Sequence, residues 1–221
     1  MNTLSADIEK NIMKSGTSIV GIVCKDGVVL AGDKRTTAGG QIVMSKTSDK
    51  VIKINDFIAV AGTGVSSDID LSQRVFSAEL RLKELKTKSR ATIKEAANLF
   101  GLMSYRNIRT PSMIASVVGT LLAGVNEDGT SELYTIEPAG GVYKVEDYDA
   151  NFGSGMPYIL GLLERQFKKD LSVKEGVELA RDCIKAAIER DPGSGNGIDV
   201  FTITKEGVKQ VVSEKSNVEY K

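Results

Sequence analysis

The sequence has 221 residues, of which 41% are apolar and 26% are charged, a balance typical of a globular chain with one sizeable core. Lys and Arg together number 29, as do Asp and Glu, so no net charge favours binding to nucleic acid or to an anionic membrane. The chain contains no histidine, which excludes Ser-His-Asp and Cys-His catalysis as well as zinc sites built on imidazole.

The chain begins with a polar leader, residues 1–16, that lacks the continuous apolar core of a secretory signal. Gly16 and Thr17 then stand directly before a β-branched run. A cut between them would give Thr17 a free amine beside its hydroxyl, one known way to activate a weak nucleophile without histidine. By itself, a Gly-Thr step more often marks a flexible residue before an edge strand, so this hypothesis depends on the rest of the chain.

The leader is followed by strand-like runs whose apolar residues are nearly continuous, which indicates strands covered on both faces. The expected strand pairs are 19–24 with 28–33 and 50–54 with 57–61. Lys25-Asp26-Gly27 is a strong hairpin turn signal between the first two. The polar residues 34–48 predict a loop, and Gly62-Thr63-Gly64 is expected to break the sheet pattern.

Two helices are expected next. The first covers about 67–86, with Ser66-Ser67 offering its N-cap. Its apolar residues fall on one stripe, expected to be the buried face: Leu71, Val75, Ala78, Leu82 and Leu85. Thr92 and Glu95 have the spacing of a capping box that starts the second helix, and Pro111 closes the region.

The second half of the chain repeats this order. Its first strands are expected at 115–125, 131–136 and 142–145. Gly153-Ser154-Gly155 leads into a third helix. Ser172 and Glu175 have capping-box spacing for a fourth helix, which stops at Asp191-Pro192. A last hairpin pairs 198–204 with 208–212.

Strands, two helices, strands, two helices and strands therefore alternate along the chain. Strands buried on both faces need a layer on each side, so the simplest architecture is α+β: two antiparallel sheets face to face, with a helix pair outside each. This is a four-layer αββα sandwich. No linker divides the chain, so we expect a single domain over 17–221 behind the leader 1–16.

The sequence carries no recognisable cofactor-binding or membrane-spanning motif. No phosphate-binding loop or dinucleotide fingerprint is present, and no run of about 18 apolar residues could span a bilayer. Cys24 and Cys183 lie far apart in apolar segments, which favours buried free thiols in a reducing cytosol over a disulfide. We therefore expect no cofactor, no metal and a cytoplasmic location.

Several spaced motifs occur together in this chain: Gly16-Thr17, Asp33-Lys34-Arg35-Thr36-Thr37, Lys50, Gly153-Ser154-Gly155 and Asp191-Pro192-Gly193-Ser194-Gly195. With these motifs the chain closely resembles proteasome β subunits, in particular the archaeal type with a short leader. The resemblance covers residues 15–212. It implies an N-terminal-nucleophile hydrolase with the αββα fold, and a cleavable propeptide over 1–16.

The resemblance also implies roles for individual residues. Thr17 matches the nucleophile exposed by self-cleavage after Gly16. Lys50 matches the lysine that stabilises the deprotonated hydroxyl and takes part in proton transfer, and Asp33 matches the carboxylate that holds this lysine and balances its charge. The polar group around the threonine amine and hydroxyl is matched by Ser154, Asp191 and Ser194, for which roles as helix caps are the alternative.

Substrate-binding positions follow in the same way. Gly64 matches the residue whose backbone N–H serves as the oxyanion donor, and Thr37 matches a strand edge along which an extended peptide would pair. A specificity pocket would be lined near Thr36, Ile52, Gly62 and Ser66. From residue volume alone, Gly62 suggests room for a sizeable apolar side chain. One extra residue between Arg35 and Lys50 could shift this pocket.

The function that this resemblance implies is a threonine endopeptidase that degrades unfolded proteins to short peptides. Seven such subunits would form a ring, with two β rings enclosed by two rings of proteasome α subunits and fed by an ATP-driven unfoldase ring. One alternative is a catalytically silent ring subunit, of β or α type. Two further alternatives are the simpler bacterial dodecameric relative and an amidase of the same hydrolase class that acts on small molecules.

Overall fold

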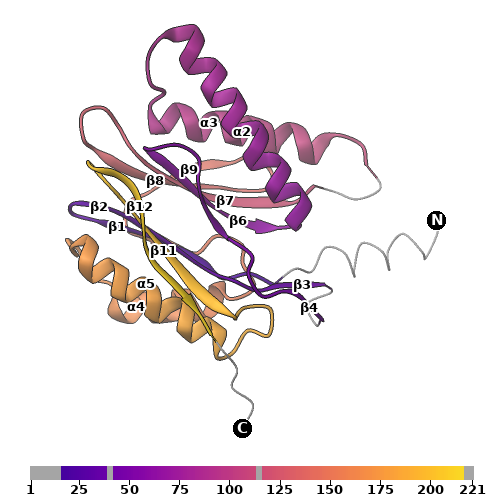
Figure 1. Cartoon of the computed structure of the whole chain (residues 1–221), viewed down its shortest axis with the longest axis vertical. Helices are drawn as coiled ribbons and strands as arrows, with labels where there is room; N and C mark the ends of the chain where they lie inside the picture. The colour runs from indigo at the N-terminus through magenta and orange to yellow at the C-terminus, as the bar shows by residue number, and fades with distance from the viewer. Residues whose placement is uncertain (1–15, 39–41, 113–115, 217–221) are drawn as a thin grey trace.

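The computed structural model describes residues 16–38, 42–112 and 116–216 (Figure 1). Most of the expected leader, residues 1–15, and the Gly39-Gly40 part of the expected loop lie outside these ranges. The helices and strands carry the labels of Figure 1, which begin at α2 and β1.

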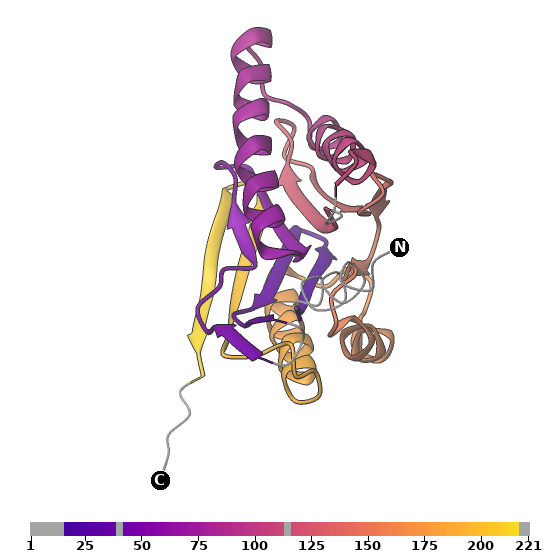
Figure 2. The same cartoon turned by 90° about the vertical axis from the view of Figure 1, so that its right-hand side faces the viewer.

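The described residues form two five-stranded antiparallel sheets that lie face to face (Figures 1 and 2). The first has the strand order β10-β1-β2-β11-β12, and the second the order β5-β6-β7-β8-β9. The strands of the first sheet are β1 (Ile19–Cys24), β2 (Gly27–Asp33), β10 (Tyr148–Asp149), β11 (Gly197–Thr204) and β12 (Gly207–Lys215). Those of the second are β5 (Val51–Lys53), β6 (Ile58–Gly64), β7 (Val118–Val125), β8 (Ser131–Ile136) and β9 (Val142–Val145).

A pair of helices covers the outer face of each sheet (Figure 1). Helices α4 (Met156–Gln166) and α5 (Val173–Ile188) pack on the first sheet, and α2 (Ser66–Thr87) and α3 (Ile93–Arg109) pack on the second. The predicted αββα sandwich is confirmed. It gives the central strands two apolar faces each, and every residue of β2 and β7 is indeed buried.

Three apolar layers hold the sandwich together. The middle layer lies between the sheets and includes Ile19, Leu30, Leu121 and Leu133. An outer layer joins α4 and α5 to β1, β2 and β11, and another joins α2 and α3 to β6, β7 and β8. The capping boxes predicted at Thr92 and Ser172 are both present and start α3 and α5.

Three local predictions were wrong. The stretch expected as a loop over 34–48 contains a small two-stranded sheet, β3 (Thr36–Ala38) with β4 (Ile42–Ser45). Gly62-Thr63-Gly64 does not break the sheet, because β6 continues through it in register with β7. The two-residue strand β10, at the edge of the first sheet, was not anticipated. Short edge strands carry too few residues to give a period-two signal.

The expected buried stripe of α2 was also assigned to the wrong face. Its core-facing residues are Ser72, Gln73, Phe76 and Leu80, and its N-cap is Val65, without a side-chain cap. The stripe instead leaves large apolar side chains exposed, namely Leu71, Val75, Leu82 and Leu85. Two candidate stripes exist on this helix, and the longer apolar one faces away from the core. Such a surface is typical of a subunit interface.

The two cysteines are free and buried, as the sequence indicated. Burial raises the pKa of each thiol to about 12, so neither is a reactive thiolate at neutral pH. Within the described ranges, no helix is long and apolar enough to cross a membrane. The same residues contain no cluster of cysteine and carboxylate side chains that could hold a metal ion.

Candidate active site

Thr17 lies at the entrance to β1 and is fully buried. The backbone of the next residue fixes it there, because Ser18 N–H donates to Asp33 Oδ1 at 3.0 Å and Ser18 O accepts from Asp33 N–H at 3.1 Å. On the other side, the Thr17 carbonyl accepts from Gly155 N–H at 3.3 Å. Thr17 is thus held between the end of β2 and the start of α4.

The Thr17 hydroxyl stands between a lysine and its own preceding carbonyl. It donates to the Gly16 carbonyl oxygen at 2.7 Å and accepts from Lys50 Nζ at 3.1 Å. Lys50 directly precedes β5 and is only 6% exposed. Gly32 of β2 makes room for it, since a Cβ there would lie 2.8 Å from Lys50 Cβ. The Thr17 hydroxyl is therefore in direct hydrogen-bond contact with both the Lys50 amine and the Gly16 carbonyl.

Burial shifts the pKa of both Lys50 and Asp33. Burial lowers the pKa of Lys50, while the nearby Asp33 charge acts in the opposite direction. For Asp33, burial raises the pKa to about 6, against the lowering effects of Lys50 and of three backbone N–H donors. Those donors belong to Ser18, Arg35 and Gly195, at 2.8–3.0 Å. Asp33 therefore organises three backbone segments around the site and acts on Lys50 through its charge.

Ser154, Asp191 and Ser194 form one hydrogen-bonded chain beside the Thr17 nitrogen. Ser154 Oγ accepts from Thr17 N–H at 3.0 Å and donates to Asp191 Oδ2 at 2.6 Å. Ser194 Oγ donates to the same carboxylate oxygen at 2.6 Å. Since this uses the single hydroxyl proton of Ser194, Ser18 Oγ must be the donor in its 2.6 Å contact with Ser194 Oγ. Asp191, which accepts from both serines, therefore fixes which hydroxyl donates in each hydrogen bond of this network.

Glycines let the backbones around Thr17 approach closely. A Cβ on Gly16 would lie 2.1 Å from the Gly193 Cα, so these two residues pack backbone to backbone. A Cβ on Gly153 would lie 2.4 Å from the Thr17 carbonyl oxygen and 3.6 Å from Thr63 Cγ2. The end of β6 thus borders the same space as Thr17.

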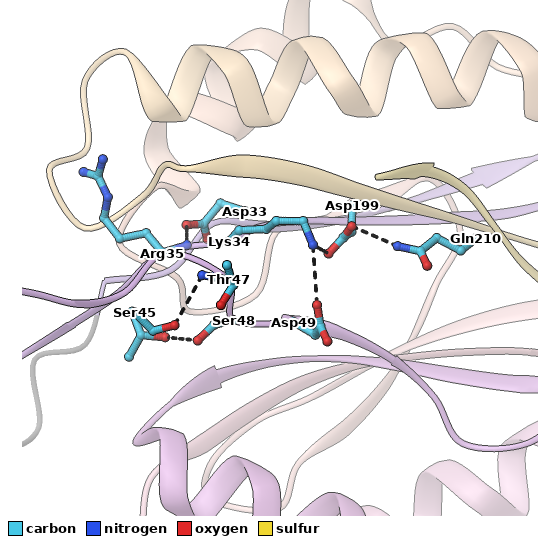
Figure 3. A network of polar contacts seen from close by, with 10 residues as sticks. Asp33, Lys34, Arg35, Ser45, Thr47, Ser48, Asp49, Asp199 and Gln210 are labelled. Carbon is cyan, nitrogen blue, oxygen red and sulfur yellow. Dashed lines mark hydrogen bonds and ion pairs between the residues drawn. The ribbon is translucent and has the colours of Figure 1, made fainter. Parts of the chain in front are cut away.

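A second polar network fixes the segment that carries Lys50 (Figure 3). The buried Lys34 side chain forms an ion pair with Asp199 of β11 and donates to Asp49 Oδ1 at 3.4 Å. Gln210 of β12 donates to the other Asp199 oxygen at 2.9 Å. The backbone of Ser48 donates to Lys34 O at 3.0 Å. Lys34 therefore ties residues 48–49, directly before Lys50, to the first sheet.

A pocket of about 200 Å³ opens beside this site. It is lined by Thr36, Ser48, Asp49, Lys50, Ile52, Gly62, Ser66, Ile69, Asp70 and Gln73. All four residues expected near the specificity pocket are among them. Seven of the ten lining residues nevertheless carry polar side chains, whereas the volume of Gly62 suggested room for an apolar one. Gly62 accommodates Ile69 of α2 instead, since a Cβ on it would lie 2.8 Å from Ile69 Cγ2.

Thr37 is the middle residue of the short strand β3, and Gly64 is the last residue of β6. The Thr37 Oγ1 accepts from Gly16 N–H at 2.9 Å, so Gly16, the last residue of the expected leader, lies against this strand. Gly64 ends β6 with φ +121°, and a Cβ on it would lie 2.0 Å from the Val117 carbonyl oxygen. Only glycine fits this backbone conformation.

Comparison with known proteins agrees with this geometry. The family model described as "Proteasome subunit" matches residues 13–203, most of the chain. The chain belongs to the proteasome subunit family. The buried Thr17–Lys50 pair and all of the sandwich except the end of β11 and strand β12 lie inside the matched range.

Individual relatives are β-type proteasome subunits. The chain is 36% identical over 198 residues to proteasome subunit beta of Nanoarchaeum equitans, covering 90% of this chain and 98% of the relative. It is 37% identical over 207 residues to proteasome subunit beta of Methanothermobacter thermautotrophicus, covering 94% of both. Proteasome subunit beta 1 of Thermococcus gammatolerans is 38% identical over 196 residues, covering 89% and 93%. The resemblance drawn from the motifs is confirmed.

Some residues that shape this proteasome-family site were not singled out from the sequence. Ser18 is fully buried and donates to both Asp33 and Ser194. Gly193 packs on Gly16, and Asp70 and Gln73 line the pocket from α2. The position of Ser18 next to the nucleophile was the available signal. For Asp70 and Gln73 the sequence contains no such signal, because only the packing of α2 in the folded chain places them beside the pocket.

Proposed function

We propose that the chain is the catalytic β subunit of a proteasome core particle, a threonine endopeptidase that exposes Thr17 by cutting the Gly16–Thr17 bond. One observation carries this proposal: the Thr17 hydroxyl contacts both Lys50 Nζ and the Gly16 carbonyl within a buried site. The supporting comparison is the family of the chain, whose β-type members are generally proteases.

Self-cleavage would begin at Lys50. Burial lowers the pKa of its amine and so increases the neutral form, which can accept the Thr17 hydroxyl proton. Thr17 Oγ1 then bonds to the Gly16 carbonyl carbon. As that carbon releases the Thr17 nitrogen, the nitrogen takes the proton back from Lys50, leaving an ester between Gly16 and the threonine side chain. Water hydrolyses the ester to a Gly16 carboxylate and a free Thr17.

Hydrolysis of a peptide would use the same groups in the matured chain. The new Thr17 amine remains beside Ser154 Oγ, which accepts from this nitrogen and donates to Asp191. The Thr17 amine and Lys50 together accept the Thr17 hydroxyl proton while Oγ1 attacks the substrate carbonyl carbon. Gly64 N–H is proposed as the donor to the oxyanion that forms. The leaving amine takes the proton, and water then releases the acyl-enzyme. Thr37 would pair with the extended substrate, as it now binds Gly16.

Assembly into a particle is part of this proposal. The exposed apolar side chains along α2 form a surface that neighbouring subunits would cover. We propose rings of seven β subunits between rings of α subunits, with unfolded chains delivered by an ATP-driven ring.

The direct test is the intact mass of the chain after co-assembly with an α subunit. The wild-type chain is expected to lose residues 1–16. Gly16→Ala is expected to remain mostly full length, because its Cβ would fall 2.1 Å from the Gly193 Cα and displace the scissile carbonyl. A chain produced to begin at Thr17 serves as the control and should hydrolyse peptides. A full-length wild-type mass in assembled particles would instead favour a catalytically silent ring subunit.

Peptide turnover should decline as the pH falls through about 6, the pKa to which burial raises Asp33. Protonation removes the negative charge beside Lys50 and puts a hydroxyl hydrogen where three backbone N–H groups now donate. The linked effect on stability has the opposite sign: a raised carboxyl pKa favours the folded chain at low pH, and this contribution is lost as pH rises through about 6. The measurement is kcat/KM between about pH 5 and 8. A flat profile on the acid side would contradict this role for Asp33.

A further inference from the structure

The pocket beside Thr17 stands where the side chain of a bound substrate would lie. Lys50 lines the pocket, and its Nζ also contacts the attacking Thr17 Oγ1. A peptide whose carbonyl is within reach of Oγ1 therefore directs the side chain of that same residue, on the acyl side of the scissile bond, into the pocket. This placement rests on the proposed function; the chemistry of the lining goes beyond it.

Gln73 gives the pocket a polar side chain whose amide is not engaged by another described residue. Its side chain comes from α2, is only 5% exposed, and lines the cavity. In the part of the chain that the structure describes, its amide has no hydrogen-bond partner, whereas the neighbouring Thr36 and Ser48 hydroxyls bind each other at 2.6 Å. The amide nitrogen would lie 3.4 Å from a Cβ on Gly62, which is also part of the pocket lining. A polar ligand in the pocket would bind this amide directly, whereas an apolar ligand would remove its access to water without replacing the hydrogen bond.

Two carboxylates lie at the open side of the same pocket. Asp49 and Asp70 both line it, and their side chains are 68% and 64% exposed. Asp49 shares the single cation of Lys34 with Asp199, which leaves this trio with a net negative charge. Asp70 pairs with Arg74 at 2.8 Å, but an exposed pair of this kind is weak and exchanges readily. The positive charge of Lys50 is in turn opposed by Asp33.

From these contacts we propose that the pocket selects a long basic side chain, arginine or lysine, so that the enzyme cuts after basic residues. The chain of the ligand would pass Ile52 and Ile69, and its cationic head would donate to the Gln73 amide oxygen and to the carboxylates of Asp49 and Asp70. An apolar side chain would leave the Gln73 amide unpaired, and an acidic one would face two carboxylates. Both are therefore poorer occupants.

The test compares the particle assembled with its α subunit on peptide amides that differ only in the residue before the cleaved bond: Arg, Lys, Gln, Leu or Glu. We expect kcat/KM for Arg and Lys to exceed that for Leu. Asp70→Asn should lower the Arg-to-Leu ratio roughly 1.4- to fivefold, the range for an exposed charge pair. Gln73→Leu should lower it further by favouring Leu. Glu79→Gln removes the same charge from an exposed position of α2 outside the pocket and should leave the ratio unchanged.

Each failure has a distinct meaning. If Leu, Gln or Glu is the best substrate and neither Asp70→Asn nor Gln73→Leu changes the ratios, the basic preference is wrong while the peptidase assignment stands. If no peptide is hydrolysed and the leader remains uncut, the proposed function fails, and the preference with it. Because Asp70 is exposed, its variant tests the pocket without testing folding.

Discussion

Thr17→Ala is expected to give a chain that folds and assembles, keeps residues 1–16, and hydrolyses peptides at least about 10⁴-fold more slowly than the wild type. The substitution removes the only oxygen that contacts both Lys50 Nζ and the Gly16 carbonyl in the described site. It leaves the backbone contacts of Thr17 to Ser154 and Gly155 in place. Intact mass and turnover of a fluorogenic peptide measure the two effects on one preparation.

Thr17→Ser is the matched control for this result. It restores the hydroxyl without the methyl group, so we expect both self-cleavage and measurable turnover. If Thr17→Ala still lost its leader or hydrolysed peptides, the nucleophile would have to be another group, and the assignment of Thr17 would be wrong. If both variants behaved alike, the hydroxyl would be irrelevant to either reaction.

The layered fold could be predicted from the sequence because its signals are local and repeated. Continuous apolar runs mark the strands buried on both faces, and the capping boxes at Thr92 and Ser172 mark two helix starts. The errors fall where local pattern and tertiary position disagree. On α2 the longer apolar stripe, which includes Leu71 and Leu85, faces outward, and nothing in the helix itself identifies the side that packs on the sheet.

The candidate site was predictable to the extent that its residues sit in recognisable motifs. Thr17, Lys50 and Ser154 come from three distant segments, and the fold brings all three into hydrogen-bond contact. The roles assigned to them remain predictions. The chemistry of the pocket was not accessible in this way, because Asp49 and Asp70 approach it from a loop and a helix whose relative position is set by the packing of α2 on the second sheet.

Lys50→Arg is expected to block self-cleavage and to lower peptide turnover by at least about a thousandfold, although it preserves the positive charge. A guanidinium stays protonated in proteins, so it can donate to Thr17 Oγ1 but cannot accept its proton. Lys50→Met removes both the charge and the proton acceptor and should be equally inactive. Intact mass and kcat/KM again provide the readouts, with particle assembly as the check on folding.

Lys53→Met is the control, since Lys53 lies on the same short strand β5 but is exposed and pairs with Asp56. It should retain cleavage and turnover. The comparison between Arg and Met at position 50 separates two functions of the lysine. Substantial activity in Lys50→Arg, together with none in Lys50→Met, would mean that position 50 supplies only positive charge. In peptide hydrolysis, proton transfer would then depend on the Thr17 amine and the hydrogen-bonded Ser154 and Asp191 beside it. Self-cleavage occurs before this amine is free, so it would need a different base.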